Sequence, residues 1–402
     1  MISVSEAKAI VTKHAMLLNI IALPLDKALG YCLAQSVISK WSIPNFAQSS
    51  MDGYALQLAY RNNKLPIQDE LPAGTSKKIS LKEAHAVKVF TGGPVPENAD
   101  VVIQKEWVNA SATEIEIDEQ KKLDPAIAAG LNIRKPGSDI QKGTVALEAG
   151  TILHSAHIAF LASIGETVVM VYRKPIVAIV ITGNELVKPG NQLQDGEVFE
   201  ANATGLSAAL KQACVEAIHV LYTKDNLAET TACIQSALDL ADMVLITGGV
   251  SVGDYDFVAN ADYDFVANAC LNSGVEKLFH GVKQKPGKPL LFGKKENKLV
   301  VGLPGNPVSV LSCYTQYVLP AILQLSGLNT IKPAAAKLSV AYEKKSALCF
   351  FLKGREENGI VTVLPNQASY QLSSFATANC WIELAEDVYQ FDTMKNVPIY
   401  YI

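Results

Sequence analysis

The chain of 402 residues has no hydrophobic run long enough to cross a bilayer, since its longest clean apolar run is only Ile176–Ile181. The N-terminal segment MISVSEAKAIVTKHA is amphipathic. It lacks the basic start and apolar core of a secretory leader. We therefore expect a cytoplasmic protein with no membrane partner.

A basic excess and an ordered cysteine pattern are also missing. Lys and Arg number 35 against 39 Asp and Glu, a formal charge of −4, which argues against a nucleic-acid partner. The seven cysteines form no CxxC and no zinc-type spacing with histidine, so we expect buried thiols in a reducing compartment. The 49% of apolar residues supplies several cores, and the length suits two to four domains.

The predicted secondary structure changes twice within the first 174 residues, from helical to β-rich and back to helical. Apolar spacing predicts two helices between residue 1 and about 40, with Ser3 or Ser5 as the first cap. Short β-rich runs separated by Pro and Gly turns follow, and they indicate a β insert. Helical spacing returns at Ser155–Ile164, so the N-terminal helical part resumes after the insert.

The next 150 residues alternate apolar strands with helices, beginning with the strand IVAIVITG at 176–183. This rhythm predicts a parallel sheet covered by helices on both faces, with ligands beyond the carboxyl ends of its strands. From about residue 330 the chain consists of short strands, which predict a small β-barrel or sandwich.

Glycine turns and carboxylates follow the predicted strands. TGNEL and TGGVSVG place free backbone N–H groups where anions are stabilised, and neither matches a dinucleotide fingerprint or a P-loop. Three carboxylates at one sheet edge beside an anion imply a bridging Mg²⁺. The candidate anion-binding residues are Gly248, Gly249 and Ser251, and the candidate metal ligands are Glu185, Asp225 and Asp256.

Two proline-rich turns complete this half of the chain. In VKQKPGKPLLFG, Lys283, Lys285 and Lys288 are held by prolines, which suits a phosphate or oxyanion and equally suits a solvated hairpin. In GLPGNPVS, Pro304 and Pro307 frame a turn into a helix, with Asn306 expected as its cap.

Three motifs in the first half also carry candidate groups. They are Asp52 in SSMDGYA, Thr91 in FTGGPVP and Asp139 in RKPGSDI. Each, taken alone, is better explained as a turn than as a functional site.

Together and in this order, SSMDGYA, TGGPVP, the Asp139 turn, TGNEL, TGGVSVG, KPGKP and LPGNPVS resemble the molybdopterin molybdenumtransferase family, the MoeA type also seen in the gephyrin E domain. The resemblance implies a multidomain α/β and β protein. It implies a discontinuous helical domain I (1–42 and 143–174), a β-rich domain II insert (43–142), a molybdopterin-binding α/β domain III with a parallel sheet (175–328) and a C-terminal β-barrel domain IV (329–402).

The family's reaction inserts molybdenum from molybdate into adenylylated molybdopterin and yields AMP and molybdenum cofactor, with Mg²⁺. The resemblance further implies a homodimer whose site combines domain II of one subunit with domain III of the other, and the molybdopterin adenylyltransferase as a candidate partner. By motif match it assigns catalytic roles to Asp52, Thr91, Asp139, Glu185, Asp225 and Asp256, and substrate contacts to Lys285, Lys288, Pro304 and Pro307.

Two features depart from the family pattern. Lys353 stands where an Arg is common, which leaves its role and that of Arg355 open. The octet DYDFVANA occurs twice in tandem, at 254–261 and 262–269, and we expect Asp256 rather than Asp264 to act. The alternative functions are a molybdopterin adenylyltransferase or related nucleotide pyrophosphatase, and a non-catalytic scaffold of the gephyrin type.

Overall fold

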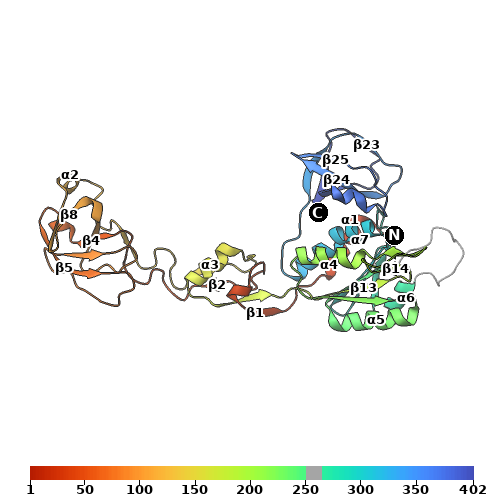
Figure 1. The fold of residues 1–402 in the computed structure, drawn as a ribbon, viewed down its shortest axis with the longest axis horizontal. Coiled ribbons are helices and arrows are strands. Elements are labelled where there is room, and N and C mark those ends of the chain that lie inside the picture. The colour runs from red at the N-terminus through yellow and green to blue at the C-terminus, as the bar shows by residue number, and fades with distance from the viewer. Residues whose placement is uncertain (250–264) are drawn as a thin grey trace. The chain divides into compact units, whose positions relative to one another are not determined.

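The computed structural model describes residues 1–249 and 265–402, and the chain divides into two units. The larger unit contains Met1–Ala22, Gly30–Ala34 and Met170–Ile402. The smaller unit contains Leu23–Leu29 and Gln35–Val169. Figure 1 shows the elements of both units.

The N-terminal helix α1 (Val4–His14) begins with a capping box. The Ser3 hydroxyl accepts a hydrogen bond from the Glu6 N–H, and the Glu6 carboxylate accepts one from the Ser3 N–H, as the expected cap requires. The second helix expected before residue 40 is wrong. Strand β1 (Ile20–Pro24) and a single 3-10 turn (Leu25–Lys27) stand in its place, because β-branched residues favour strands and Pro24 ends a helix.

A six-stranded sheet forms most of the smaller unit, in the order β7-β4-β6-β5-β9-β8. It confirms the expected β-rich insert. Only the β5–β6 pair is parallel, and apolar side chains are buried on both faces of the sheet. The strands are β4 (Gly53–Leu56), β5 (Leu65–Leu71), β6 (Ala86–Val89), β7 (Val101–Gln104), β8 (Val108–Ala110) and β9 (Glu114–Ile117).

Short ladders flank this sheet in the sequence, and they bring segments about 85 to 110 residues apart into register. The pairs are β2 (Val37–Ile38) with β11 (Val145–Leu147), and β3 (Gln48–Ser49) with β10 (Ile133–Arg134). The chain returns through helix α3 (Ser155–Ser163), as expected, and strand β12 (Val168–Tyr172), which pairs with β1.

The described part of the larger unit is built on a six-stranded sheet in the order β16-β13-β17-β21-β20-β18. The expected parallel arrangement holds for the first four strands. Strand β20 runs antiparallel to both of its neighbours, β21 and β18, so β20 alone is reversed within this sheet. The strands are β13 (Val177–Thr182), β16 (Ile218–Thr223), β17 (Met243–Thr247), β18 (Glu276–His280), β20 (Leu291–Lys295) and β21 (Lys298–Leu303).

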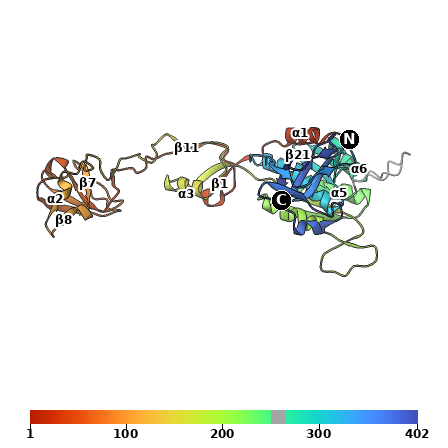
Figure 2. The same cartoon turned by 90° about the horizontal axis from the view of Figure 1, so that it is seen from above.

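Helices cover both faces of this sheet (Figures 1 and 2). Alternate residues of β13 explain why: Ile179 packs in one core with α1, α4 and α7, and Val180 packs in the other core with α5 and α6. All six residues of β13 are buried, as an apolar parallel strand requires. The covering helices are α4 (Asn202–Gln212), α5 (Leu227–Leu240), α6 (Phe265–Asn272), α7 (Pro307–Cys313) and α8 (Leu319–Leu325).

The C-terminal strands close into a five-stranded barrel, because β24 pairs with both β25 and β26 and the ring runs β24-β25-β22-β28-β26. Because the ring is closed, this domain is a barrel and not the sandwich that the sequence also allowed. A short strand, β19 (Gln284–Lys285), adds to β24 from outside the ring. The barrel strands are β22 (Ala334–Leu338), β24 (Cys349–Glu357), β25 (Ile360–Val363), β26 (Cys380–Leu384) and β28 (Asn396–Tyr401).

Lys353 has a structural position in the barrel. Its side chain is fully buried, and its ammonium donates to the backbone carbonyls of Asn366 (2.6 Å) and Gln371 (2.8 Å). Desolvation lowers its pKa. Arg355 is exposed and pairs with Glu357 at 2.8 Å. Of the two residues, Lys353 therefore ties loops to the barrel, and Arg355 forms a local surface pair.

One continuous helical stretch, Pro307–Leu325, is long and apolar enough to cross a membrane by composition. It consists of α7, a π-helical turn (Tyr314–Val318) and α8, and 67% of its apolar window is buried inside the larger unit. A core helix accounts for this composition.

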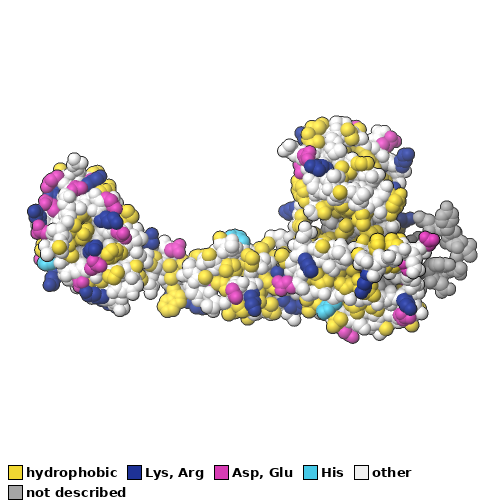
Figure 3. All heavy atoms as spheres, in the orientation of Figure 1, with side chains coloured by type: hydrophobic (Ala, Val, Ile, Leu, Met, Phe, Trp, Pro, Cys, Tyr) yellow, Lys and Arg dark blue, Asp and Glu magenta, His cyan; other side chains and the backbone are white. Residues whose placement is uncertain are grey.

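Charged and apolar side chains are interspersed over the face drawn in Figure 3.

Candidate functional site

The ends of three parallel strands meet at one edge of the larger unit's sheet. Strand β17 ends at Thr247, and the next N–H, that of Gly248, donates to the Leu303 carbonyl at the end of β21 (3.3 Å). The Thr182 hydroxyl at the end of β13 donates to the Thr247 carbonyl (3.2 Å). The structure therefore brings Thr182 of TGNEL, the first two residues of TGGVSVG (Thr247 and Gly248) and Leu303 of LPGNPVS together, as the parallel-sheet prediction required.

Close packing requires glycine in this edge. Gly248 has φ +90°, and a Cβ there would lie 2.7 Å from the Thr182 hydroxyl oxygen and 2.8 Å from its carbonyl oxygen. Gly305 packs against Gly248, since its own Cβ would lie 3.7 Å from the Gly248 Cα. The two turns thus pack backbone against backbone.

Two helices begin beside this edge. The Asn202 amide, at the start of α4, donates to the Gly305 carbonyl (2.8 Å), and Pro307 occupies the first turn of α7, as expected. Asn306 occupies the cap position, but its side chain makes no capping bond, so that part of the expectation is wrong. Pro304 is buried, whereas Asn306 and Gly305 are exposed at the surface of the turn.

Glu185 and Asp225 belong to adjacent loops at the same edge. The Asp225 N–H donates to the Asn184 side-chain carbonyl (3.4 Å), which links the loop after β16 to the loop after β13. Desolvation, followed by the negative charge of Glu185, raises the pKa of Asp225. The negative charge of Glu185 therefore makes ionisation of Asp225 less favourable, an arrangement that favours a bound cation.

The third predicted metal ligand, Asp256, lies outside the described residues, as do Ser251 and Asp264. Within residues 1–249 and 265–402, no group of three or more His, Cys, Asp or Glu side chains is placed to hold a metal ion. The predicted three-carboxylate site therefore stays a prediction.

The lysine turn, residues 283–288, shows the expected alternation of exposed and buried side chains. Lys283, Lys285 and Lys288 are exposed, whereas Gln284 between the first two is fully buried. The Lys285 ammonium lies 5.5 Å from the centre of the Phe350 ring, which places it beside the barrel. The lysines are thus presented outward by a turn whose other side is anchored in the core.

A buried polar cluster anchors this turn. The Gln284 amide donates to the Gly287 carbonyl (3.0 Å) and accepts a hydrogen bond from the Tyr317 hydroxyl. A Cβ at Gly287 would collide with the Cys313 sulfur. Desolvation raises the pKa of the Cys313 thiol to about 12, so this cysteine is an inert packing group. The sequence analysis did not predict this cluster. The one local feature that points to it is Gln284, an uncharged residue between two lysines.

Asp52 and Thr91 come together in the smaller unit. One Asp52 carboxylate oxygen accepts from the Thr91 N–H (2.8 Å) and from the Thr91 hydroxyl (2.9 Å). These bonds, in that order, lower the pKa of Asp52, and Lys105 (3.7 Å) lowers it further. The structure thus joins SSMDGYA to TGGPVP around one ionised carboxylate.

Asp139 occupies a separate turn of the same unit. The Asp139 N–H donates to the Ile43 carbonyl (3.0 Å), and the Gly137 N–H donates to the Pro44 carbonyl (2.8 Å). The side chain of Asp139 is exposed. The predicted residues therefore form two described sets: Asp52, Thr91 and Asp139 in the smaller unit, and Gly248, Gly249, Glu185, Asp225, Lys283, Lys285, Lys288, Pro304 and Pro307 in the larger unit.

Three family models match the chain in succession. They describe the MoeA N-terminal region (domain I and II) over residues 2–165, a probable molybdopterin binding domain over 178–324, and the MoeA C-terminal region (domain IV) over 335–401.

Relatives match along nearly the whole chain. A molybdopterin molybdenumtransferase of Haemophilus influenzae is 34% identical over 377 residues, covering 91% of this chain and 89% of the relative. One from Staphylococcus epidermidis is 31% identical, covering 95% and 91%. A solved molybdopterin biosynthesis MoeA protein from Pyrococcus horikoshii superimposes with a TM-score of 0.84 at 28% identity, covering 100% of this chain and 99% of that one.

Proposed function

The chain belongs to the molybdopterin molybdenumtransferase family and is an enzyme of that type, and from this we propose that it inserts molybdenum from molybdate into adenylylated molybdopterin, yielding molybdenum cofactor and AMP. The observation that carries the proposal is the succession of all three family regions along one chain. A molybdopterin adenylyltransferase or related pyrophosphatase is not favoured, because the N-terminal and C-terminal regions match in addition to the molybdopterin-binding domain.

The chemistry of the substrates fits the groups at the strand ends. The activated pterin carries a diphosphate and molybdate is a dianion, so both need cations and N–H donors. In the proposal, Lys283, Lys285 and Lys288 hold the anions, and Gly249 supplies a main-chain N–H group. The Gly248 N–H already donates to the Leu303 carbonyl, so Gly248 contributes its close backbone packing at the turn. The new bonds form between the molybdenum of molybdate and the substrate's own sulfur atoms, and the protein positions these reactants.

Magnesium is part of the proposal. Two neighbouring carboxylates, of which Asp225 is made harder to ionise by burial and by the charge of Glu185, suit a divalent cation with oxygen ligands. Glu185 and Asp225 would hold Mg²⁺, with Asp256 as the third predicted ligand. When bound, the cation would polarise the diphosphate toward cleavage.

The direct test is a turnover assay. Purified protein, adenylylated molybdopterin, molybdate and Mg²⁺ should release AMP and produce cofactor that activates a molybdenum-free molybdoenzyme. Glu185→Ala should reduce AMP release by about 10²–10³-fold, as loss of one preorganised electrostatic group does. Glu216→Ala is the matched control, because its side chain is 72% exposed and precedes β16 at the opposite end of the strand. Wild-type rates in Glu185→Ala would remove Glu185 from the site.

The proposal includes a homodimer in the cytoplasm, with the smaller unit of one subunit completing the site of the other, and with the adenylyltransferase as a candidate partner that delivers substrate. Asp52→Ala and Asp225→Ala each remove one half of such a site. Mixed dimers of the two variants would contain one intact site and regain AMP release. No recovery after verified subunit exchange would place Asp52 and Asp225 in a site within one subunit.

A further inference from the structure

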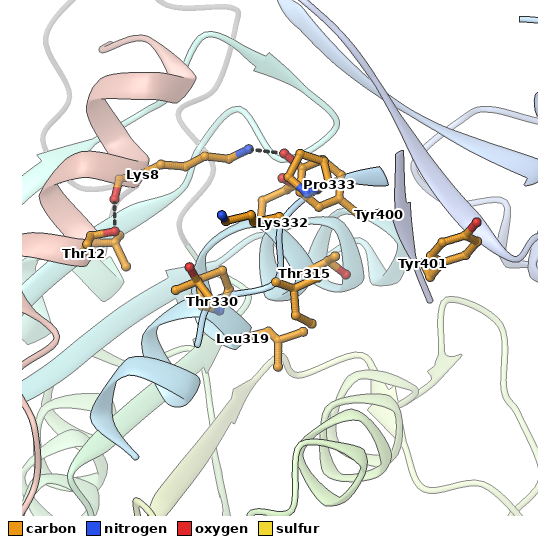
Figure 4. Close-up of a pocket in the computed structure, with 13 residues that line it drawn as sticks. Lys8, Thr12, Thr315, Leu319, Thr330, Lys332, Pro333, Tyr400 and Tyr401 are labelled. Carbon is orange, nitrogen blue, oxygen red and sulfur yellow. Dashed lines mark hydrogen bonds between the residues drawn. The ribbon is translucent and has the colours of Figure 1, made fainter. Parts of the chain in front are cut away.

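A cavity lies in the larger unit, between α1, the π-helical turn with α8, and the last barrel strand β28 (Figure 4). Its volume is about 290 Å³. On the long helix its lining begins at Thr315, eight residues after Pro307, which corresponds to roughly 12 Å along the helix axis. The lining residues are Lys8, Val11, Thr12, Thr315, Gln316, Leu319, Pro320, Thr330, Ile331, Lys332, Pro333, Tyr400 and Tyr401.

The walls are mostly apolar and aromatic, with two lysines and no acidic side chain. Figure 4 shows the Lys8 side chain reaching toward Tyr400, with Lys332 lying near both. Lys332 makes no ion pair among the described residues. A pocket with this lining favours a ligand that combines an apolar body with a negative charge.

Lys8 is held in a fixed position. Its ammonium donates to the Glu383 carboxylate (3.1 Å) and to the Tyr400 hydroxyl (3.0 Å), and the Tyr400 hydroxyl donates to the same carboxylate (2.7 Å). Since Glu383 already compensates Lys8, the positive charge left for a ligand is that of Lys332.

Gln316 adds an unmet polar group. It is 2% exposed and lines the cavity, and neither the oxygen nor the nitrogen of its amide has a hydrogen-bond partner in the part of the chain that the structure describes. A buried amide without partners is unfavourable unless another molecule supplies them. The π-helical turn that carries Gln316 is a rare conformation that occurs frequently at functional sites.

We propose that this cavity binds a small arylalkanoate, a carboxylic acid with one aromatic ring. The carboxylate pairs with Lys332, and the ring packs among Tyr400, Leu319 and Val11. The volume lies just below the common range of about 300–1,000 Å³ for ligand pockets, so a single ring with a short chain is the size that fits.

Isothermal titration calorimetry on the full chain tests the proposal. The probes are phenylacetate, 3-phenylpropanoate and 4-phenylbutyrate, each compared with its neutral amide. We expect saturable binding of at least one acid and at least tenfold weaker binding of its amide. Lys332→Gln should weaken binding of the acid about tenfold, and Leu319→Trp, which fills the cavity, should abolish it.

Lys13→Gln serves as the matched control, since Lys13 is an exposed lysine on the same helix as Lys8 and does not line the cavity. It should leave the affinity unchanged. AMP release by Lys332→Gln should equal that of the unaltered chain, which shows that the variant is folded. The proposal is overturned if none of the three acids binds saturably, if acid and amide bind equally, or if Lys332→Gln binds as tightly as the unaltered chain.

Discussion

The lysine turn depends on one buried hydroxyl, and Tyr317→Phe removes it. The Tyr317 side chain is 1% exposed, and its hydroxyl donates to the amide oxygen of Gln284, which in turn holds Gly287. In Tyr317→Phe the Gln284 oxygen loses the one partner found for it among the described residues. The turn that presents Lys285 should then loosen without any change in its charge.

The magnitude follows from burial. Gln284 is fully buried, so its orphaned oxygen cannot turn to water, and the expected loss of stability is about 1–3 kcal/mol. Tyr314→Phe is the matched control on the same π-helical turn. Its hydroxyl donates to the Ala209 carbonyl (2.7 Å), which also accepts from the Ala213 N–H (3.1 Å), so the expected loss is only about 0.5–1.5 kcal/mol.

Urea unfolding and the AMP-release assay together separate anchoring from bulk stability. Tyr317→Phe should raise KM for adenylylated molybdopterin about fivefold, equivalent to ~1 kcal/mol of binding, with kcat changed less. Tyr314→Phe should leave KM unchanged. Equal KM values in the two variants, or an unchanged midpoint in Tyr317→Phe, would refute the anchoring role of this cluster.

Three further outcomes are expected. Gly53→Ala should prevent folding of the smaller unit's sheet, measured as lost solubility or lost β-type circular dichroism, because a Cβ there would collide with a backbone carbonyl of β7. Thr91→Val should raise the pKa of Asp52 toward its ordinary value, because the hydroxyl donor is lost while the Thr91 N–H and Lys105 still lower the pKa. In the unaltered chain the hydroxyl's hydrogen bond to the carboxylate persists at neutral pH and is lost as pH falls through the lowered pKa. Glu185→Gln should lower the pKa of Asp225, read from a carboxyl-carbon NMR titration, and an unchanged pKa would show that Glu185 does not act on it.

Local patterns determined much of the architecture. The apolar run 176–183 is a buried parallel strand because a strand covered on both faces has no polar side to show. Ser3 caps α1 because its spacing to Glu6 satisfies two orphan N–H groups at once. Lys283 and Lys285 are exposed around buried Gln284 because side chains alternate along an extended segment. Each of these features depends on neighbours within a few residues.

Local patterns failed where a distant partner decides the outcome. The segment Ile20–Pro24 joins a strand about 150 residues away, so its apolar spacing was mistaken for a helix. Closure of the barrel requires β24 to pair on both edges, which no short segment encodes.

Only tertiary packing sets the polar cluster under the lysine turn and the cavity beside Lys332. Gln284 meets Tyr317, and Lys8 meets Tyr400, across 33 and 392 residues of chain. Hydrogen bonds and cavities of this kind form between side chains that the sequence places far apart. The sequence alone therefore indicated the type of site, and folding decided what anchors it.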